Sequence, residues 1–286
     1  MLLHQAGLKS WIPFYKETLD SNKQQRKDIY SNSANGNYTV KVANNLYMNK
    51  HWTDTMWQRI LDSPVGAKVY EYSDLDFIFL QKVVEKITGQ SIDAYVEKEF
   101  YKPLGMSNTC FNPIKKGKPT TSIAPTESDS YFRYQIIQGY VHDMAAAMFG
   151  GVSGHAGLFS TAGDISKVLQ MLMNGGIYEG KRYFEKKTVD FFTTYKNTTR
   201  RGYGWDKTEP NTAKSNPTAD NCSLLTFGHT GFTGTCVWAD PTYNLQFIFL
   251  SNRTFPSAEN KLINSMDIRG KAQQYVYESL GIASRK

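Results

Sequence analysis

The chain has 286 residues, of which 40% are hydrophobic and 21% are charged. A chain of this length and composition can bury a substantial core, so disorder, collagen-like repeats and a coiled coil are excluded as descriptions of the whole. The 33 basic and 26 acidic residues leave a net charge of +7, but the basic pairs are scattered, so we expect no nucleic-acid partner.

The cysteines, the hydropathy pattern and the histidines exclude three further classes of protein. Cys110, Cys222 and Cys236 form no even framework, so we expect no disulfide scaffold. The best apolar run, residues 245–250, is far shorter than the roughly 20 residues that span a bilayer, so we expect no transmembrane segment. The histidines show no spacing typical of a metal site, and we expect neither a metal nor another cofactor.

A helix with clear boundaries is predicted directly after Tyr72. Apolar residues recur four apart from Leu75 to Ile87, which is the spacing of one helix face. Ser73 and Asp76 form a capping-box pattern that starts the helix, and Gly89 ends it.

Other helices and loops are predicted in the first two thirds of the chain. Thr161 and Asp164 form a second capping box, and Gly175 follows the apolar face of the helix that this box starts. The expected elements are a loop over 20–37, a short amphipathic helix over 92–100, a loop over 113–129 and a helix over 161–174.

Strands are concentrated near the end of the chain, separated by turn residues in the manner of an antiparallel meander. The predicted strands are 224–228, 235–239 and 245–251, followed by a helix over 261–280. Because helices come first and strands last, we predict an α+β fold. We expect one domain over 1–286, with a mainly helical lobe over about 1–200 and antiparallel strands plus a C-terminal helix over 201–286.

Three short motifs combine residue types that carry chemistry. They are Tyr72-Ser-Asp74 at the start of the long helix, Gly150–Thr161 before the second helix, and Phe227–Thr235 at a strand end. Each also has a structural explanation, as a helix cap, a tight loop and a glycine hairpin. In the third motif, the glycines let the backbone approach a ligand closely, and His229 and Thr230 supply neighbouring donors.

In this order, the motifs resemble those of the serine β-lactamase and penicillin-binding family, most closely its class C β-lactamase and esterase-like branch. Tyr72-Ser-Asp74 is similar to the family's Tyr-x-Asn element, and His229-Thr-Gly231 lies where other members have Lys-Thr-Gly. Further similar segments are Leu2–Leu8, Pro103–Met106, Gly157–Ala162, Tyr203–Trp205, Asp240-Pro241 and Ser251–Arg253. The resemblance covers nearly the whole chain and implies a β-lactamase/transpeptidase-like fold.

The resemblance also implies acyl transfer, in which a serine attacks a carbonyl and the covalent acyl-enzyme is released by water or another acceptor. Tyr72 would relay protons at the reacting centre, with Asp74 beside it and His229 across a common groove. The backbone N–H of Phe232 would be an oxyanion-hole donor. The other residues expected to contact substrate are Thr230, Gly231, His142, His155 and Asn252.

Two residues depart from the family's pattern. Asp74 places a carboxyl group where Asn is expected, and His229 replaces a lysine cation with an imidazole that titrates near neutral pH. Because histidine is familiar there in the esterase and peptidase relatives, a penicillinase assignment is weakened. The substrate stays open between a β-lactam, an ester and a D-amino-acid peptide.

The family's nucleophile motif, Ser-x-x-Lys, does not occur in the sequence, because no serine has a lysine three residues later. The motif would precede Leu2–Leu8, so we expect a domain that is incomplete at its N-terminus and lacks the nucleophile helix and the leading strands. We therefore expect negligible hydrolase activity from this chain alone. We also expect an open sheet edge, which pairs with another chain or stays poorly covered.

Two other functions stay open. Gly151–His155 is similar to the nucleophile elbow of an α/β-hydrolase, although His155 stands where that motif requires Gly. The second is a non-catalytic module that binds cell-wall peptide or a related acyl ligand. Because the relatives usually work outside the cytoplasm, we expect a periplasmic or otherwise exported location and a small-molecule or cell-wall peptide substrate.

Overall fold

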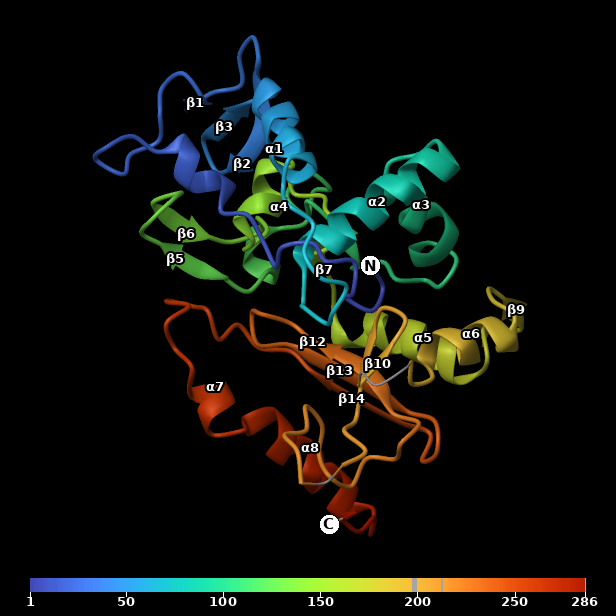
Figure 1. The fold of residues 1–286 in the computed structure, drawn as a ribbon. Coiled ribbons are helices and arrows are strands. Elements are labelled where there is room, and N and C mark those ends of the chain that lie inside the picture. The colour runs from blue at the N-terminus through green and yellow to red at the C-terminus, as the bar shows by residue number, and fades with distance from the viewer. Residues whose placement is uncertain (197–199, 212, 286) are drawn as a thin grey trace. The chain divides into compact units, whose positions relative to one another are not determined.

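The structure is a computed structural model that describes residues 1–196, 200–211 and 213–285. The chain forms two compact units, and we describe each by itself (Figure 1). Unit 1 comprises Met1–Pro103, Asn108–Phe159 and Phe255–Ser257, and unit 2 comprises Leu104–Ser107, Ser160–Thr254 and Ala258–Lys286.

The long helix of unit 1 is confirmed as α2 (Asp74–Thr88). Ser73 is its N-cap, and the Ser73 side chain accepts a hydrogen bond from the backbone N–H of Asp76. Gly89 ends the helix at φ 67°, a left-handed conformation that glycine adopts without strain. Short-range signals in the sequence therefore determine both ends of α2, whose first residue is Asp74 of the Tyr72-Ser-Asp74 motif.

Unit 1 combines further helices with short antiparallel sheets. The helices are η1 (Phe14–Thr18), α1 (His51–Leu61), α3 (Ile92–Val96), η2 (Glu97–Tyr101), η3 (Thr120–Ser122) and α4 (Met144–Met148). The strands are β1 (Tyr30–Ser31), β2 (Tyr38–Ala43), β3 (Leu46–Asn49), β4 (Cys110–Phe111), β5 (Glu127–Asp129), β6 (Gln135–Ile137) and β7 (Leu158–Phe159). Strands β1, β3 and β2 form one sheet, and β4–β7 and β5–β6 form two-stranded pairs.

Two loop predictions in unit 1 were wrong in part. The segment 20–37 contains β1, and the segment 113–129 contains η3 and β5. Both strands are short and polar in part, and pairing stabilises them: β1 pairs with β3 further along the chain, and β5 pairs with the neighbouring β6, which local composition does not reveal. The short helix predicted over 92–100 is confirmed as α3, which continues into the π-helical turn η2.

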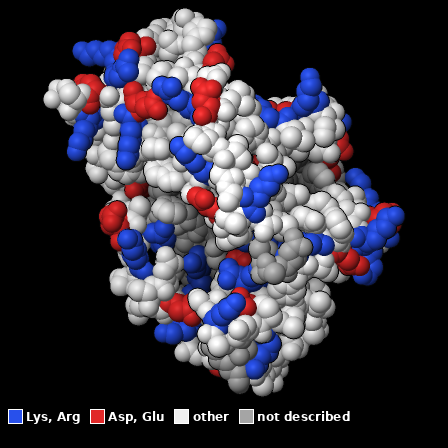
Figure 2. Space-filling model, in the orientation of Figure 1, with Lys and Arg blue, Asp and Glu red and all other residues white. Residues whose placement is uncertain are grey.

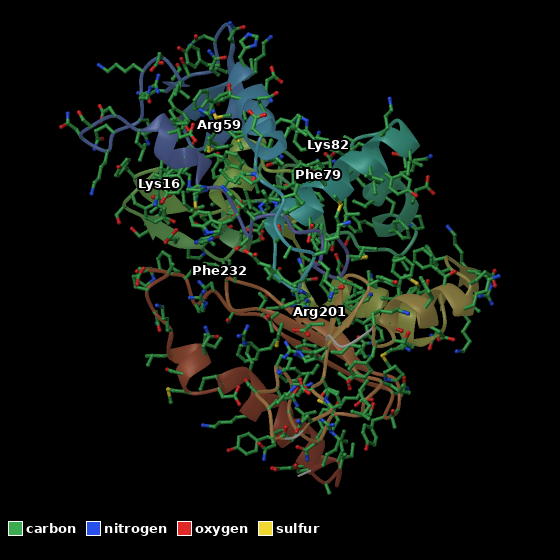
Figure 3. All side chains as sticks on the ribbon, in the orientation of Figure 1. Lys16, Arg59, Phe79, Lys82, Arg201 and Phe232 are labelled. Atoms are coloured by element: carbon green, nitrogen blue, oxygen red, sulfur yellow. The ribbon has the colours of Figure 1, made fainter. Side chains whose placement is uncertain are left out.

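The core of unit 1 lies between its small sheets and its helices. Phe132, Met48, Ile60 and Leu75 are among its fully buried side chains, so strands and helices from the first 150 residues share one apolar cluster. The rings of Phe79 on α2 and Trp57 on α1 have their centroids 5.2 Å apart. Phe79 is labelled in Figure 3. This packing fixes the position of α2 within the unit.

Unit 2 is built on a five-stranded antiparallel sheet in the order β10-β11-β12-β13-β14. The strands are β10 (Arg201–Gly202), β11 (Trp205–Lys207), β12 (Phe227–Thr230), β13 (Cys236–Asp240) and β14 (Leu245–Phe249). The predicted meander is confirmed as β12–β14. Its first strand begins at Phe227 rather than at 224, because Leu224 and Leu225 are exposed and unpaired with β13. Strands β10 and β11 were not predicted.

Helices cover this sheet. The predicted helix over 161–174 is confirmed as α5 (Ala162–Met173), with Thr161 as its N-cap, and Leu169 of α5 packs with Phe227 and Ala239 of the sheet. The predicted final helix is divided into α7 (Leu262–Ser265) and α8 (Ile268–Ser279), because Asp267 between them has φ 49°. Unit 2 also contains α6 (Lys186–Thr193) and the hairpin β8 (Ile177–Tyr178) and β9 (Lys181–Arg182).

These elements confirm the α+β class, with every strand pair of the described residues antiparallel. Cys110, Cys222 and Cys236 are free thiols in the structure. None of the described helices is both long and apolar enough to cross a bilayer. Lysine and arginine side chains are scattered among acidic ones on the face shown in Figure 2.

Candidate functional site

The start of α2 presents Tyr72 to solvent and buries Ser73. The Tyr72 side chain is 46% exposed, whereas Ser73 is almost fully buried. The Ser73 hydroxyl donates a hydrogen bond to the Lys9 carbonyl oxygen at 2.6 Å, and the Ser73 backbone N–H donates to His4 Nδ1 at 3.0 Å. Ser73 therefore ties the helix start to the N-terminal segment and is not available as a nucleophile.

His4 also supports the Tyr72 ring. The imidazole of His4 is buried, and its centroid lies 4.3 Å from that of the Tyr72 ring and 5.4 Å from that of Phe77. Because Nδ1 of His4 accepts the Ser73 N–H, the ring plane beside Tyr72 is fixed. The sequence marked His4 only as part of a similar segment, and nothing in its local pattern indicates this contact.

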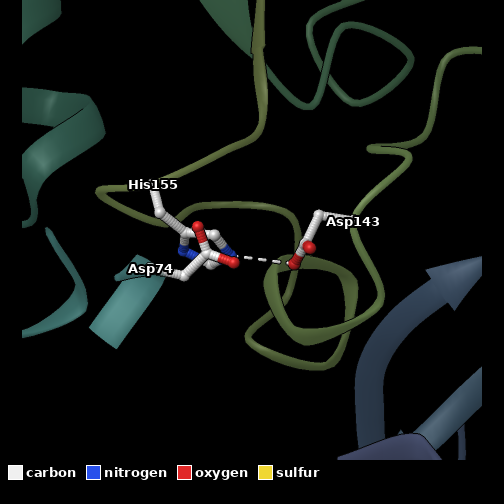
Figure 4. A group of neighbouring side chains, drawn as sticks. All are labelled: Asp74, Asp143 and His155. Atoms are coloured by element: carbon white, nitrogen blue, oxygen red, sulfur yellow. Dashed lines mark hydrogen bonds and ion pairs between the residues drawn. The ribbon is translucent and has the colours of Figure 1, made fainter. Parts of the chain in front are cut away.

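Asp74, Asp143 and His155 form a cluster in unit 1 (Figure 4). Asp74 is the first residue of α2, Asp143 is the N-cap of α4, and His155 lies in the loop before β7. His155 Nε2 lies 2.8 Å from Asp143 Oδ1, and His155 Nδ1 lies 2.8 Å from the hydroxyl oxygen of Ser153. One ligand atom from each member of the cluster lies within 4.8 Å of the other two. These three residues, from separate elements, could together hold a metal ion.

Gly154 makes this convergence possible. Its backbone N–H donates to the Gln81 side-chain oxygen at 3.0 Å, which holds the loop against α2. A Cβ at this position would lie 2.2 Å from the carbonyl oxygen of Phe77, so only glycine lets the loop approach the helix this closely.

The cluster shifts the proton affinities of its members in different directions. Burial raises the pKa of Asp74 to about 6, against the charge of His155, which lowers it. Burial also opposes the charges of the other pair and is the largest single effect, but their mutual hydrogen bond and the attraction of neighbouring opposite charges together outweigh it, so the pKa of Asp143 is lowered and the pKa of His155 is raised. The contact between Asp143 and His155 thus favours the charged form of each, and Asp74, with a raised pKa, lies in the same cluster.

His142, the neighbour of Asp143, has a different partner. Its Nε2 lies 3.1 Å from Glu127 Oε2 on β5. Burial opposes the charge of Glu127, but the hydrogen bond and charge of His142, together with a hydrogen bond from Tyr131, outweigh it and lower the pKa of this carboxyl. The expected substrate contact of His142 stays a prediction.

In unit 2, His229 lies on β12 with both ring nitrogens engaged. Arg201 Nη1 donates to His229 Nε2 at 2.9 Å, so the proton of the neutral ring is on Nδ1, which donates to the Thr230 carbonyl oxygen at 2.7 Å. Burial lowers the pKa of His229, and the positive charge of Arg201 lowers it further. His229 is therefore neutral, and the fixed positive charge at this point of the sheet belongs to Arg201 (Figure 3).

The glycine turn after β12 is held by the segment after β14. Ser251 donates to the carbonyl oxygen of Gly234 at 2.9 Å, and a Cβ on Gly234, which has φ 109°, would lie 2.4 Å from the Ser251 hydroxyl oxygen. Phe232, at the tip of the turn, is 65% exposed and lies 4.6 Å from the Arg253 guanidinium. Asn252 lines a shallow pocket beside it. Gly231 donates its N–H to the Thr235 carbonyl oxygen at 2.7 Å within the turn.

The structure thus gathers the predicted residues into two groups, one in each unit. Tyr72, Asp74 and His155 belong to unit 1, and His229 and its neighbours belong to unit 2. The expectation that Tyr72 and His229 flank one groove stays a prediction. The sequence did not indicate that Arg201 contacts His229, because Arg201 is visible there only as one of the scattered basic residues. It also did not indicate that Asp143 contacts His155; the adjacent His142 was the only signal at this position.

Comparisons with known proteins agree with these motifs. Residues 2–267 match the family described as Beta-lactamase. An Escherichia coli K12 protein, provisionally named a D-alanyl-D-alanine carboxypeptidase, is 40% identical over 226 residues, which is 74% of this chain and 52% of that protein. The N-acetylmuramyl-L-alanine amidase of Bacillus subtilis strain 168 is 39% identical over 268 residues, which is 88% of this chain and 55% of the amidase. The chain spans about half the length of these curated relatives.

Solved structures share the fold at low sequence identity. The octameric penicillin-binding protein homologue of Pyrococcus abyssi has a TM-score of 0.58 and 18% identity, with 98% of this chain and 55% of that chain covered. A penicillin-binding protein homologue of Caulobacter crescentus has a TM-score of 0.53 and 16% identity, with 88% and 64% covered. Since the sequence match extends over almost all of both units, from the N-terminal segment to the helix break at Asp267, the chain belongs to the β-lactamase family.

Proposed function

We propose that this chain carries catalytic and substrate-binding residues of a serine acyl-transfer hydrolase that cleaves an amide bond in a cell-wall type D-amino-acid peptide. The family membership and the names of two of its curated relatives, a carboxypeptidase and an amidase, support a peptide-type amide rather than a β-lactam or an ester. The observation that carries the proposal is the start of α2, where a solvent-facing Tyr72 adjoins a carboxyl group that titrates near neutral pH.

The residues of unit 1 would move protons. The Tyr72 phenol, supported by His4, takes the proton of an attacking hydroxyl and returns it to the leaving amine. Asp74, with a pKa of about 6, exchanges a proton within the same helix turn and sets the charge beside the phenol. The neighbouring Asp143 and His155 would tune this carboxyl group through their charges, since His155 lowers its pKa and Asp143 raises it.

The residues of unit 2 would bind the substrate. Because both nitrogens of His229 are engaged, the imidazole contacts Arg201 and the Thr230 carbonyl, and the buried Arg201, 3.9 Å from the Asp206 carboxylate, would act on the substrate through the position of His229. Thr230, Gly231, Phe232 and Asn252 would line the acyl and leaving-group positions, with the Phe232 N–H as oxyanion donor.

The nucleophile itself is not among these residues. No Ser-x-x-Lys occurs in the sequence, and without the nucleophilic serine of that motif no acyl-enzyme can form. We therefore propose that the 286-residue chain by itself is inactive and that activity requires a family Ser-x-x-Lys segment joined before Met1.

The test compares three proteins on diacetyl-L-Lys-D-Ala-D-Ala, an amide of a muramyl peptide, nitrocefin and a p-nitrophenyl ester. The chain alone should release no product above background, and the extended chain should cleave a peptide amide. The extended chain with Tyr72→Phe should lose at least about 100-fold in kcat, the usual scale of a general acid–base contribution. Robust turnover by the chain alone would contradict the proposal, and so would an extended chain that cleaves only the ester or nitrocefin.

A non-catalytic binding module is the second candidate, and the absence of Ser-x-x-Lys favours it. The same muramyl peptide distinguishes the two. Binding by the 286-residue chain in calorimetry, with no turnover by the extended chain, would establish the module and overturn the hydrolase. For either function we propose an exported location, since the two curated relatives are named for cell-wall peptide substrates.

We also propose that β14 pairs with a strand of another chain. In the described residues β14 has one sheet neighbour, β13, and it carries the apolar residues Phe247 and Phe249 without a charged side chain. Such an edge is a template for strand addition. Light scattering should show concentration-dependent association that Phe247→Lys abolishes and Tyr243→Lys, in the neighbouring turn, does not. A monomer at all concentrations would refute this pairing.

A further inference from the structure

The cluster of Asp74, Asp143 and His155 lies in a pocket of unit 1. All three residues line it, and the rest of its wall is mainly apolar. The other lining residues are Trp11, Ile12, Pro13, Phe14, Tyr15, Leu75, Ile78, Met144 and Ala145. Among the described residues that line the pocket there are two carboxylates and neither a lysine nor an arginine. Two carboxylates in an apolar pocket attract a cation strongly, because little water screens them.

The imidazole is oriented for a role in such a site. The Ser153 hydroxyl lies 2.8 Å from His155 Nδ1, so this nitrogen is engaged on the side of the ring away from Asp143. His155 Nε2 is thereby turned toward the carboxylates, and the side chain is only 4% exposed. A histidine that binds a metal through one nitrogen typically has the other nitrogen hydrogen-bonded in this way.

The ligand set and its spacing fit one divalent ion. One imidazole nitrogen and two carboxylate oxygens are ligands that Zn²⁺ takes at about 2.0–2.2 Å. Ligand atoms around such an ion are separated by about 3–3.5 Å in tetrahedral geometry. The three atoms of the cluster already lie within 4.8 Å of one another, so small side-chain rotations suffice.

We propose that Asp74, Asp143 and His155 form a binding site for a divalent transition-metal ion of the Zn²⁺ type, with the remaining coordination position open to the pocket. The ion replaces the hydrogen that His155 Nε2 and Asp143 Oδ1 share, and that proton is released to solvent. The site stands on the geometry of unit 1 and does not depend on the proposed acyl transfer.

The test is Zn²⁺ binding to the full 286-residue chain, measured by calorimetry after treatment with a chelator. We expect one tight site with a dissociation constant in the micromolar range or below. Co²⁺ should bind in its place and give the visible absorption of a four- or five-coordinate ion. Asp74→Asn, Asp143→Asn and His155→Gln should each weaken binding at least about 100-fold. Asn at position 143 retains the N-cap of α4, so this variant keeps the local fold.

Two further variants separate this site from adventitious binding. Ser153→Ala should weaken binding about 10–100-fold, since it removes the partner that orients the histidine. His51→Ala, an exposed histidine outside the cluster, should leave binding unchanged. Circular dichroism of each metal-free variant checks that it folds. Wild-type binding weaker than millimolar would overturn the proposal, and so would equal binding by the folded Asp74→Asn and Asp143→Asn variants.

Discussion

Lys207 gives a measurable pH dependence of stability. This lysine of β11 is 1% exposed, and its Nζ donates to the carbonyl oxygens of Thr226 at 3.0 Å and Leu225 at 3.3 Å. Burial lowers its pKa from 10.5 to about 8, against a smaller opposing effect of Asp240. We expect Lys207→Met to remove the part of the pH dependence of the unfolding free energy that comes from this lysine and to leave the contributions of the other titratable groups unchanged.

The sign and size follow from the two pKa values. Below about pH 8 Lys207 is charged in both states, so the folded state bears the cost of its burial. Between about pH 8 and 10.5 the native lysine loses its proton while the unfolded one keeps it, so stability rises with pH. At 1.36 kcal/mol per pKa unit the full difference is about 3 kcal/mol, and because the interval from pH 7.5 to pH 10 covers only part of the titration, the expected change is about 2 kcal/mol.

The assay is urea unfolding followed by tryptophan fluorescence at pH 7.5 and pH 10. The free energy of unfolding of the wild type, minus that of Lys207→Met, should increase by about 2 kcal/mol between these pH values. Lys98→Met, at a lysine that is largely exposed, is the matched control and should show no such change. An unchanged difference for Lys207→Met, or one that decreases, would refute the reasoning.

Two further predictions concern the candidate site. Gly154→Ala should destabilise the protein by about 1–3 kcal/mol, because its Cβ would overlap the Phe77 carbonyl oxygen. Gly163→Ala in α5 is the control and should not destabilise it, because no atom lies within 4 Å of the new Cβ. Thermal melts that rank the two variants in the opposite order would contradict this prediction. Arg201→Met should raise the pKa of His229 in an NMR titration, since the substitution removes a positive charge 2.9 Å from Nε2. A His229 pKa that falls or stays constant would contradict a contribution of Arg201 to the lowered pKa.

Local signals in the sequence determined the elements with strong boundaries. The cap at Ser73, the stop at Gly89 and the cap at Thr161 act over one helix turn, so they are readable without the tertiary fold. The strands β12–β14 were readable for a similar reason, since turns of fixed chemistry separate apolar runs. The motif order also indicated the family, which the comparisons confirm.

Contacts between distant segments were decided by the tertiary structure alone. The approach of His155 to Asp143 and Asp74 depends on Gly154 lying against α2. The lowered pKa of His229 depends on its burial and on Arg201, which comes from a strand that local propensity did not predict. Hydrogen bonding and burial at these points arise from segments tens of residues apart. A sequence therefore names the residues that can carry charge, but the low-dielectric surroundings that set their pKa values exist only once the chain is folded.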